Sequence, residues 1–427
     1  MVLILFGLPF FIDSVPATVQ ELKSMVLGEA IHDKLMYVDV YDHTPPVATM
    51  IHSVLDSVFG RSLMGRHVLA IFLLFFQAAF FAILLINNKA YTESTYVPAL
   101  VFAVLSLFSV DMLSLSPELL ASTLLLLALN NLFREIEFTR QRDEFILNLG
   151  IYLGLATLLV FSTYIFLIGT IIILVISTRV NLRRILLLFF GFLLPHALLL
   201  TFYFYKGETS LLWRNFYVPN LVPFRNNLID WGSLFVLFFL PGVYFILSLI
   251  TVGRDVRLTK YQSQLVQVMF LWLVIAVIHL FLTPERSPHS LIFVLPPLAF
   301  LIGHYFLHIR RKWLAELLLW TFIIGLVTIS LLSRYGKLEN VQYASLFVTT
   351  KQQLPVQGQK ILILEEEQEL YLKNELAGGF LNWNLSKEFF EEPEYFQNDI
   401  IILKAFQKSP PQVIVDKNDL MREVLKR

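Results

Sequence analysis

The sequence predicts a polytopic α-helical membrane protein with about 11 transmembrane helices and a small C-terminal soluble α/β domain. Three observations predict it. Of the 427 residues, 56% are hydrophobic and only 15% are charged, against about 45–50% and about 25% in soluble domains. The apolar residues gather in runs whose lengths approach the roughly 20 residues with which a helix crosses a bilayer. Beyond residue 335 charged residues become frequent and the apolar runs shorten.

Charge and cysteine content exclude several classes of function. The formal net charge is zero, so nothing indicates a nucleic-acid partner. The chain has no cysteine, which excludes structural disulfides and thiolate metal sites. The first residues, MVLILFGLPFFID, carry no basic region and no small-residue cleavage site. They therefore predict a short first span rather than a cleaved signal peptide.

The membrane spans follow from the apolar runs in chain order. Two of them, at 97–110 and 164–177, are short, and short helices thin the bilayer locally or line a cavity. The expected spans are 2–12, 67–86, 97–110, 117–133, 146–162, 164–177, 185–204, 234–250, 265–282, 291–307 and 314–333.

Basic residues predict the orientation, because short loops rich in Lys and Arg stay in the cytoplasm. Four such clusters lie between spans, and an even number of spans separates each from the next. The N-terminus is then cytoplasmic, and the first loop (13–66) and the C-terminal domain are extracytoplasmic. The clusters are Arg134/Arg140/Arg142, Arg179/Arg183/Arg184, Arg254/Arg257/Lys260 and Arg310/Arg311/Lys312.

The expected division of the chain is a membrane domain over residues 1–335 and an extracytoplasmic domain over 336–427. In the second domain, short apolar runs at 361–364, 399–406 and 412–416 predict strands. The stretch ELYLKNELAGGFLNW between the first two runs predicts a helix.

The first outer loop holds the most informative stretch, VDVYDHTPPVATMIH. Upstream of it, residues 21–31 form an amphipathic pattern that predicts a helix lying in the membrane interface. The two prolines restrict the residues before them to extended conformations and remove two backbone donors. They hold Asp42 and His43 where the chain turns back into an apolar helix at 47–59.

Further acids and cations stand in the outer loops. Acids at membrane depth are costly and mark functional sites by default. A carboxylate can act as a general base toward a hydroxyl or bind a divalent metal ion, and Arg or His can bind a phosphate and stabilise its charge. The candidates in these loops are Glu21, Asp39, Asp42, His43, Asp111, Glu118, Arg286 and His289.

Structural roles compete with these functional ones. Asp39 and Asp42 can be solvated acids of a turn. Asp111 can cap the following helix, or Ser116 can do so with Glu118 in the first turn. Arg286 can anchor at the headgroup level. His196 and His279 lie within apolar spans, which favours hydrogen bonding between helices.

The order of these motifs resembles the GT-C superfamily of polytopic membrane glycosyltransferases, which includes protein O-mannosyltransferases and the aminoarabinose transferases of lipid A. The resemblance is carried by GEAIHDKLMYVDVYDHTPPVATMIHSVLDSVFGRS in the first loop, the span led by Arg66, Asp111 after the next span, SPELLASTLLLLAL and ERSPHSLIFVLPPLAFLIG. It covers most of the membrane domain.

This resemblance implies a function, a place in the cell and roles for residues. It implies transfer of a sugar from a polyprenyl-phosphate donor to an acceptor on the outer face of a bacterial cytoplasmic membrane. Membrane lipid and envelope proteins are the further expected partners, and a divalent metal ion stays open as a cofactor. Asp39, Asp42 and Asp111, with Glu21 or Glu118, would be the acid, base or metal groups. His43, Arg225, Arg286 and His289 would hold phosphate.

Two departures from the family pattern keep an alternative open. Many members carry an Asp-Glu pair where this chain has Val19-Gln20, with Glu21 next to it. The aminoarabinose transferases have Glu-Lys before the two prolines, where this chain has His43-Thr44. The alternative is a non-catalytic membrane subunit of an envelope assembly. A transporter is disfavoured, because no pair of matching Gly/Pro-broken spans recurs in two halves.

Overall fold

The computed structural model describes residues 2–12, 15–32, 34–137, 142–178, 180–222, 226–254, 258–348, 357–366, 368–391 and 396–424. The chain divides into two compact units. The first unit consists of Met1–Pro16, Met64–Leu198 and Arg225–Leu346, and the second of Ala17–Leu63, Leu199–Phe224 and Phe347–Arg427. In this division residues 17–63 of the first outer loop group with the C-terminal segment, whereas the sequence predicts them as part of the membrane domain.

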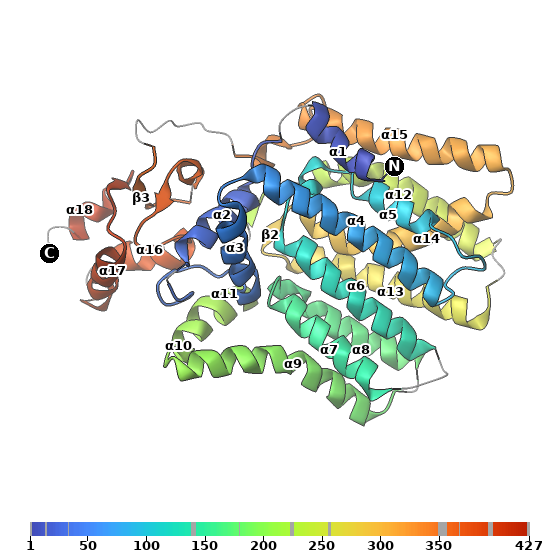
Figure 1. The fold of residues 1–427 in the computed structure, drawn as a ribbon, viewed down its shortest axis with the longest axis horizontal. Helices are drawn as coiled ribbons and strands as arrows, with labels where there is room; N and C mark the ends of the chain where they lie inside the picture. The colour runs from blue at the N-terminus through green and yellow to red at the C-terminus, as the bar shows by residue number, and fades with distance from the viewer. Residues whose placement is uncertain are drawn as a thin grey trace. The chain divides into compact units, whose positions relative to one another are not determined.

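The first unit is helical (Figure 1). Every expected span coincides with a helix, although the span expected at 97–110 ends as an α-helix at Leu105 and is followed by the 3₁₀ turn η1 (Val110–Leu113). The helices are α1 (Val2–Ile12), α4 (Leu63–Asn87), α5 (Val97–Leu105), α6 (Pro117–Ile136), α7 (Asp143–Thr157), α8 (Ile165–Ser177), α9 (Leu182–Tyr205), α12 (Trp231–Arg254), α13 (Lys260–Leu282), α14 (Leu295–His308) and α15 (Lys312–Arg334).

Among the described residues, seven helical segments are long and apolar enough to cross a membrane. The segments are 63–87, 117–136, 182–205, 231–253, 260–282, 288–308 and 312–334. The residues 161–177 form a shorter apolar helix. The chain is therefore a multi-pass integral membrane protein, as the sequence predicts.

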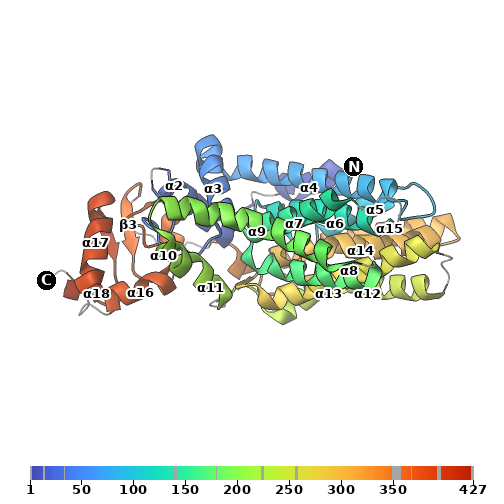
Figure 2. The same ribbon diagram turned by 90° about the horizontal axis from the view of Figure 1, so that it is seen from below.

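Polar and small residues hold neighbouring helices of this unit together. Gln77 of α4 donates from Nε2 to Leu119 O, Ser122 Oγ and Thr123 Oγ1 of α6, each at 2.8 Å. Helix α6 also packs against α7 (Figure 2). Amide hydrogen bonds of this kind join helices where lipid cannot satisfy polar groups.

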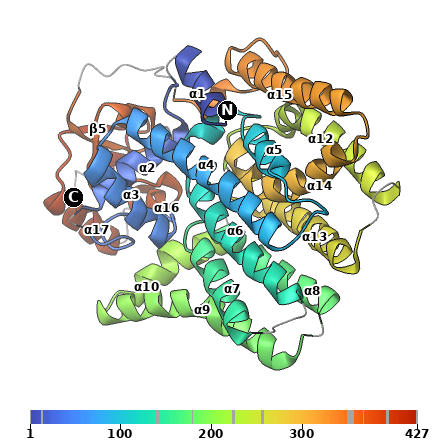
Figure 3. The ribbon, with the colours of Figure 1, turned by 45° about the vertical axis from the view of Figure 1, so that its right-hand side comes forward.

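Helices α7 and α9 lie next to each other (Figure 3). They approach through glycines. A Cβ atom on Gly150 would lie 2.3 Å from Leu188 O, and one on Gly154 would lie 2.4 Å from Phe192 O. The small-xxx-small spacing of Gly150 and Gly154 lets the two backbones touch, which is how membrane helices pack without a hydrophobic driving force.

The second unit combines the first outer loop with a parallel sheet. Its sheet has the order β4-β3-β5, and Ile361 of β3 pairs with Leu376 and Val413. The small α/β region is thus confirmed. Its elements are α2 (Val19–Ala30), α3 (Pro46–Phe59), α10 (Thr209–Leu212), the π-turn η3 (Trp213–Tyr217), α11 (Val218–Leu221), β3 (Lys360–Ile363), η6 (Glu369–Leu372), β4 (Glu375–Leu376), α16 (Trp383–Glu391), α17 (Phe396–Lys408), β5 (Val413–Val415) and α18 (Leu420–Val424).

Two local predictions in the C-terminal region are wrong. The run at 399–406 is part of helix α17, because Ile402 and Phe406, four residues apart, pack on the same core, which is helical spacing. The stretch 369–383 is not a helix: η6 and the short strand β4 are followed by Gly378 and Gly379, whose φ angles of +66° and +74° end regular structure. Strands at 361–364 and 412–416 are confirmed as β3 and β5.

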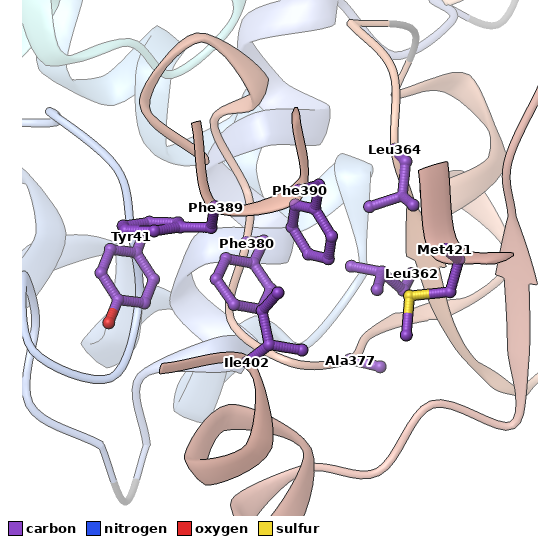
Figure 4. Packing of buried hydrophobic residues seen from close by; sticks show 9 residues of the cluster. All are labelled: Tyr41, Leu362, Leu364, Ala377, Phe380, Phe389, Phe390, Ile402 and Met421. Carbon is purple, nitrogen blue, oxygen red and sulfur yellow. The ribbon is translucent and has the colours of Figure 1, made fainter. Parts of the chain in front are cut away.

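Tyr41 of the first loop lies in the hydrophobic core of the C-terminal region (Figure 4). Its ring stacks on Phe380 at a centroid distance of 5.2 Å and meets the edge of Phe389 at 5.2 Å. Two backbone hydrogen bonds add to this contact, from Tyr41 N to Gly379 O at 2.8 Å and from Asn382 N to Tyr41 O at 3.1 Å. The residue after Tyr41 is Asp42, so this packing places its carboxylate beside the C-terminal region.

Candidate functional site

Asp42 is completely buried and is surrounded by donors. Its Oδ1 lies 3.3 Å from Lys23 Nζ and accepts a hydrogen bond from Asn382 Nδ2 at 3.3 Å. Its Oδ2 accepts from Thr44 N at 3.2 Å and from the Thr44 hydroxyl. Elements from three parts of the chain, namely α2, the loop before α3 and the residue before α16, thus meet at one carboxylate.

The charge state of Asp42 follows from opposing effects. Burial alone would raise the pKa of a carboxyl group, because it penalises the charged form. The positive charge of Lys23, then His43 and the hydrogen bonds from Thr44, outweigh burial and hold the pKa of Asp42 well below its usual range. The carboxylate is therefore ionised at neutral pH.

His43 stands next to this carboxylate, with its Nδ1 3.7 Å from Asp42 Oδ1 and 2.6 Å from Asn382 Nδ2. Burial lowers the pKa of His43 to about 4; Lys23 adds to this effect and Asp42 opposes it. The imidazole is therefore neutral at pH 7. Its side chain is 28% exposed, whereas that of Asp42 is completely buried.

The loop that presents Asp42 and His43 is fixed from several sides. Tyr37, which adopts a φ of +68°, donates its hydroxyl proton to Thr44 O at 2.6 Å. Asn215 donates to Tyr37 O and Asn220 donates to His43 O, both at 2.8 Å. Loop residues held by such bonds keep a reacting group in one geometry, which is a requirement for a site.

The two other acids of the first loop have partners of their own. Asp39 pairs with Lys408 and accepts from Leu35 N at 3.1 Å. Glu21 forms a capping box at the start of α2: Thr18 Oγ1 accepts from Glu21 N at 3.1 Å, and Glu21 Oε2 accepts from Thr18 N at 3.1 Å. A capping box satisfies two backbone donors at a helix start, which is a structural role for Glu21.

A second polar cluster, in the first unit, is centred on Asp111 of η1. Asp111 Oδ2 lies 3.2 Å from His289 Nδ1, and His289 Nε2 lies 2.9 Å from Ser114 Oγ. Asp111 Oδ1 accepts from the hydroxyl of Ser109. All four side chains are buried, so the predicted residues Asp111 and His289 are direct partners.

Tyr343, in the segment after α15, closes this cluster. Its hydroxyl oxygen accepts from Val110 N at 2.7 Å and lies 3.0 Å from Ser109 Oγ. Burial, with a contribution from the charge of Asp111, raises the pKa of Tyr343 well above its usual range. The phenol therefore stays protonated and fastens η1 to the segment that follows the last span.

The remaining candidates have local contacts. Glu118 is in the first turn of α6, where Ser116 accepts from Leu119 N at 3.1 Å, so an acid there complements the helix dipole. Arg286 donates to Ile229 O at 2.9 Å and covers the ring of Trp231 at 4.3 Å. Arg225 lies outside the described residues.

The histidines of the apolar spans bond between helices. His196 Nε2 lies 2.7 Å from Thr157 Oγ1, and His279 Nε2 lies 2.9 Å from Ser162 Oγ. Across the described ranges no group of three or more His, Asp or Glu side chains is arranged to hold a metal ion.

Four of the expected residues thus fall into two clusters, Asp42 with His43 in the second unit and Asp111 with His289 in the first. Sequence reasoning missed Lys23 and Asn382. Lys23 is one lysine on an amphipathic helix, and nothing in the pattern distinguishes it. Asn382 is 340 positions from Asp42, a separation that only the tertiary fold bridges.

Comparisons with known proteins agree with this architecture. Residues 45–338 match a family described as "Family of unknown function (DUF6427)". No curated protein sequence matches the chain. The fold is similar to the crystal structure of ArnT from Cupriavidus metallidurans bound to undecaprenyl phosphate, with a TM-score of 0.52 and 11% identity over 100% of this chain and 86% of that one. The apo state of the same protein gives a TM-score of 0.48 and 13% identity, over 96% and 83%.

Proposed function

This chain belongs to the DUF6427 family, and we propose that it is an integral membrane glycosyltransferase that uses a polyprenyl-phosphate-linked sugar. The observation that carries the proposal is the buried, ionised carboxylate of Asp42 beside Lys23 and His43. The fold resembles that of ArnT, whose crystal structure contains undecaprenyl phosphate. The proposal places the reaction on the outer face of a bacterial cytoplasmic membrane, with the N-terminus in the cytoplasm.

In the proposed reaction the acceptor hydroxyl takes the place of one of the donors around the buried carboxylate of Asp42, and Asp42 then acts on this hydroxyl. The hydroxyl oxygen forms a bond to C1 of the sugar while the bond from C1 to the phosphate oxygen breaks, and polyprenyl phosphate leaves. The hydroxyl proton passes to Asp42 or to the leaving phosphate. Because the pKa of Asp42 is low, the carboxylate is a weak proton acceptor. Its main contribution is to orient the hydroxyl and to stabilise the positive charge that develops on it.

The leaving phosphate requires positive charge or hydrogen-bond donors. Lys23 supplies a charge next to Asp42, and its side chain is 25% exposed. His43 is neutral and supplies a hydrogen bond instead. The proposal keeps Asp111 and His289 as a second candidate pair. It keeps Arg286 as a group at the headgroup level, because its guanidinium is already engaged with Trp231.

The test is a transfer assay with the purified full-length protein in lipid nanodiscs and a panel of radiolabelled polyprenyl-phosphate sugars. Asp42→Asn and Asp111→Asn are compared with Asp56→Asn, which removes a carboxylate of α3 that pairs with His32 at 2.8 Å. We expect transfer by the parent and by Asp56→Asn, and a loss of at least about 100-fold in Asp42→Asn. Transfer by Asp42→Asn at the parental rate would refute the role of Asp42.

One observation favours a second candidate, a non-catalytic membrane subunit of an envelope assembly. Both oxygens of Asp42 already accept from protein groups, namely Lys23, Thr44 and Asn382, as in a purely structural carboxylate. If no donor in the panel supports transfer and other envelope proteins co-purify stably with the chain, this second function is the better account.

A further inference from the structure

One amide group of the C-terminal region bridges the two proposed site residues. Asn382 Nδ2 lies 3.3 Å from Asp42 Oδ1 and 2.6 Å from His43 Nδ1. The backbone of Asn382 is itself fixed, because its N–H donates to Tyr41 O at 3.1 Å and its carbonyl accepts from Ser386 N at 3.1 Å and Ser386 Oγ at 2.8 Å. The amide is therefore held between α16 and the first loop rather than free to follow a neighbouring side chain.

The hydrogen-bond network determines where the protons lie. An ionised carboxylate can only accept hydrogen bonds, so the NH₂ end of Asn382 must face Asp42. The same nitrogen faces Nδ1 of His43, and therefore Nδ1 must accept. A neutral imidazole whose Nδ1 is an acceptor carries its proton on Nε2. The amide nitrogen of Asn382 then donates to two acceptors, Asp42 Oδ1 and His43 Nδ1.

We propose that Asn382 is a positioning residue that locks His43 as the Nε2–H tautomer and directs this N–H to an oxygen of the donor phosphate. The part of this inference that concerns phosphate rests on the proposed function; the part that concerns the tautomer does not. In this arrangement His43 cannot act as a general base, because its free nitrogen is occupied by Asn382. Lys23 then supplies positive charge at the phosphate, and His43 supplies a hydrogen bond that orients it.

The surroundings of His43 agree with a neutral ring. The charged groups that face it are Lys23 of α2 and Asp42 of its own loop. Lys23 opposes a second positive charge on the ring, and the carboxylate of Asp42 is already neutralised by Lys23. Asn382 carries no charge. Its hydrogen bonds to Nδ1 of His43 and to the carboxylate of Asp42 therefore leave the net charge of this group unchanged.

The experiment follows the tautomer directly. Full-length protein labelled with ¹⁵N-histidine is placed in nanodiscs, and the two ring nitrogens of His43 are identified by their loss in His43→Gln. The variants are Asn382→Leu, which keeps the size but removes the amide, and Asn398→Leu as the matched control. Asn398 is a partly buried residue of α17 that donates to Glu388 O at 3.2 Å. Undecaprenyl phosphate and inorganic phosphate serve as probes.

We expect an unprotonated Nδ1 and a protonated Nε2 in the parent and in Asn398→Leu. In Asn382→Leu we expect a mixture of tautomers and a loss of about tenfold in kcat/KM for transfer, the scale of one hydrogen bond. Undecaprenyl phosphate should shift the Nε2 signal in the parent more than in Asn382→Leu; an equal response to inorganic phosphate would identify free phosphate as the ligand.

Two results would overturn the inference whatever the transfer assay shows. The first is a proton on Nδ1 of His43 in the parent at pH 7. The second is an unchanged tautomer in a folded Asn382→Leu. Absence of transfer in the parent with every donor would instead refute the proposed function, while the nitrogen signals still decide the role of Asn382.

Discussion

Nδ1 of His289 lies 3.2 Å from Oδ2 of Asp111, and this contact joins the turn before α6 to the turn before α14. Both side chains are buried, and Ser114 lies on the far side of the imidazole at 2.9 Å. Breaking a buried pair by removing one partner leaves an uncompensated polar or charged group. The cluster therefore stabilises the ends of several helices whatever chemistry it supports.

The first prediction concerns this pair. His289→Ala should destabilise the protein by about 3 kcal/mol, because it leaves Asp111 buried without its partner. Asp111→Asn, which keeps the size and one acceptor, should cost less. A double-mutant cycle of thermal unfolding in nanodiscs measures the coupling, which we expect to be about 1–3 kcal/mol. Additive effects would show that the two side chains do not interact.

The second prediction concerns Tyr41. Tyr41→Ala should cost about 3–5 kcal/mol, because it removes a buried ring from the core formed with Phe380 and Phe389. Tyr41→Phe keeps the rings in contact and serves as the control. Limited proteolysis should then cut the first loop near Asp42 faster in Tyr41→Ala only. Equal protection in both variants would mean that the loop is held by other contacts.

The third prediction concerns pH. His43 has a pKa of about 4 in the folded state and about 6.5 when unfolded. Between these values the unfolded chain binds more protons, so stability falls as the pH is lowered from 7 to 4, by at most about 1.4 kcal/mol per pH unit. Asp42 has a depressed pKa, so its contribution is lost only at lower pH. In His43→Gln the melting temperature should depend less on pH between pH 7 and 4.5. An unchanged pH dependence of the melting temperature would contradict the buried, neutral state of His43.

The fourth prediction concerns the contact between α7 and α9. Gly154→Val should destabilise the helix pair strongly, because its Cβ would lie 2.4 Å from Phe192 O. Gly242→Ala in α12 is the control, since a Cβ there meets nothing within 4 Å. Melting temperatures in nanodiscs compare the two. A stable Gly154→Val variant would show that the helices do not approach as closely as the structure places them.

The helices were predictable from the sequence because long apolar runs leave few alternatives to a spanning helix. The helix at 399–406 was not predictable, because eight residues fit a strand or one face of a helix equally well. The position of Ile402 in the core decides between the two. Asp42 became a candidate because of its place before two prolines. Its partners Lys23 and Asn382 did not, because their proximity arises only when the first loop packs on the C-terminal region.

The partners of Asp42 are synthesised at different stages of translation. Lys23 precedes most of the spans, but Asn382 and the core that receives Tyr41 are made only after the span at 312–334. A nascent chain whose last span is already inserted therefore still lacks one side of the carboxylate. A premature stop codon after the span at 312–334 and before residue 382 would leave a membrane-inserted protein in which Asp42 is never fully enclosed.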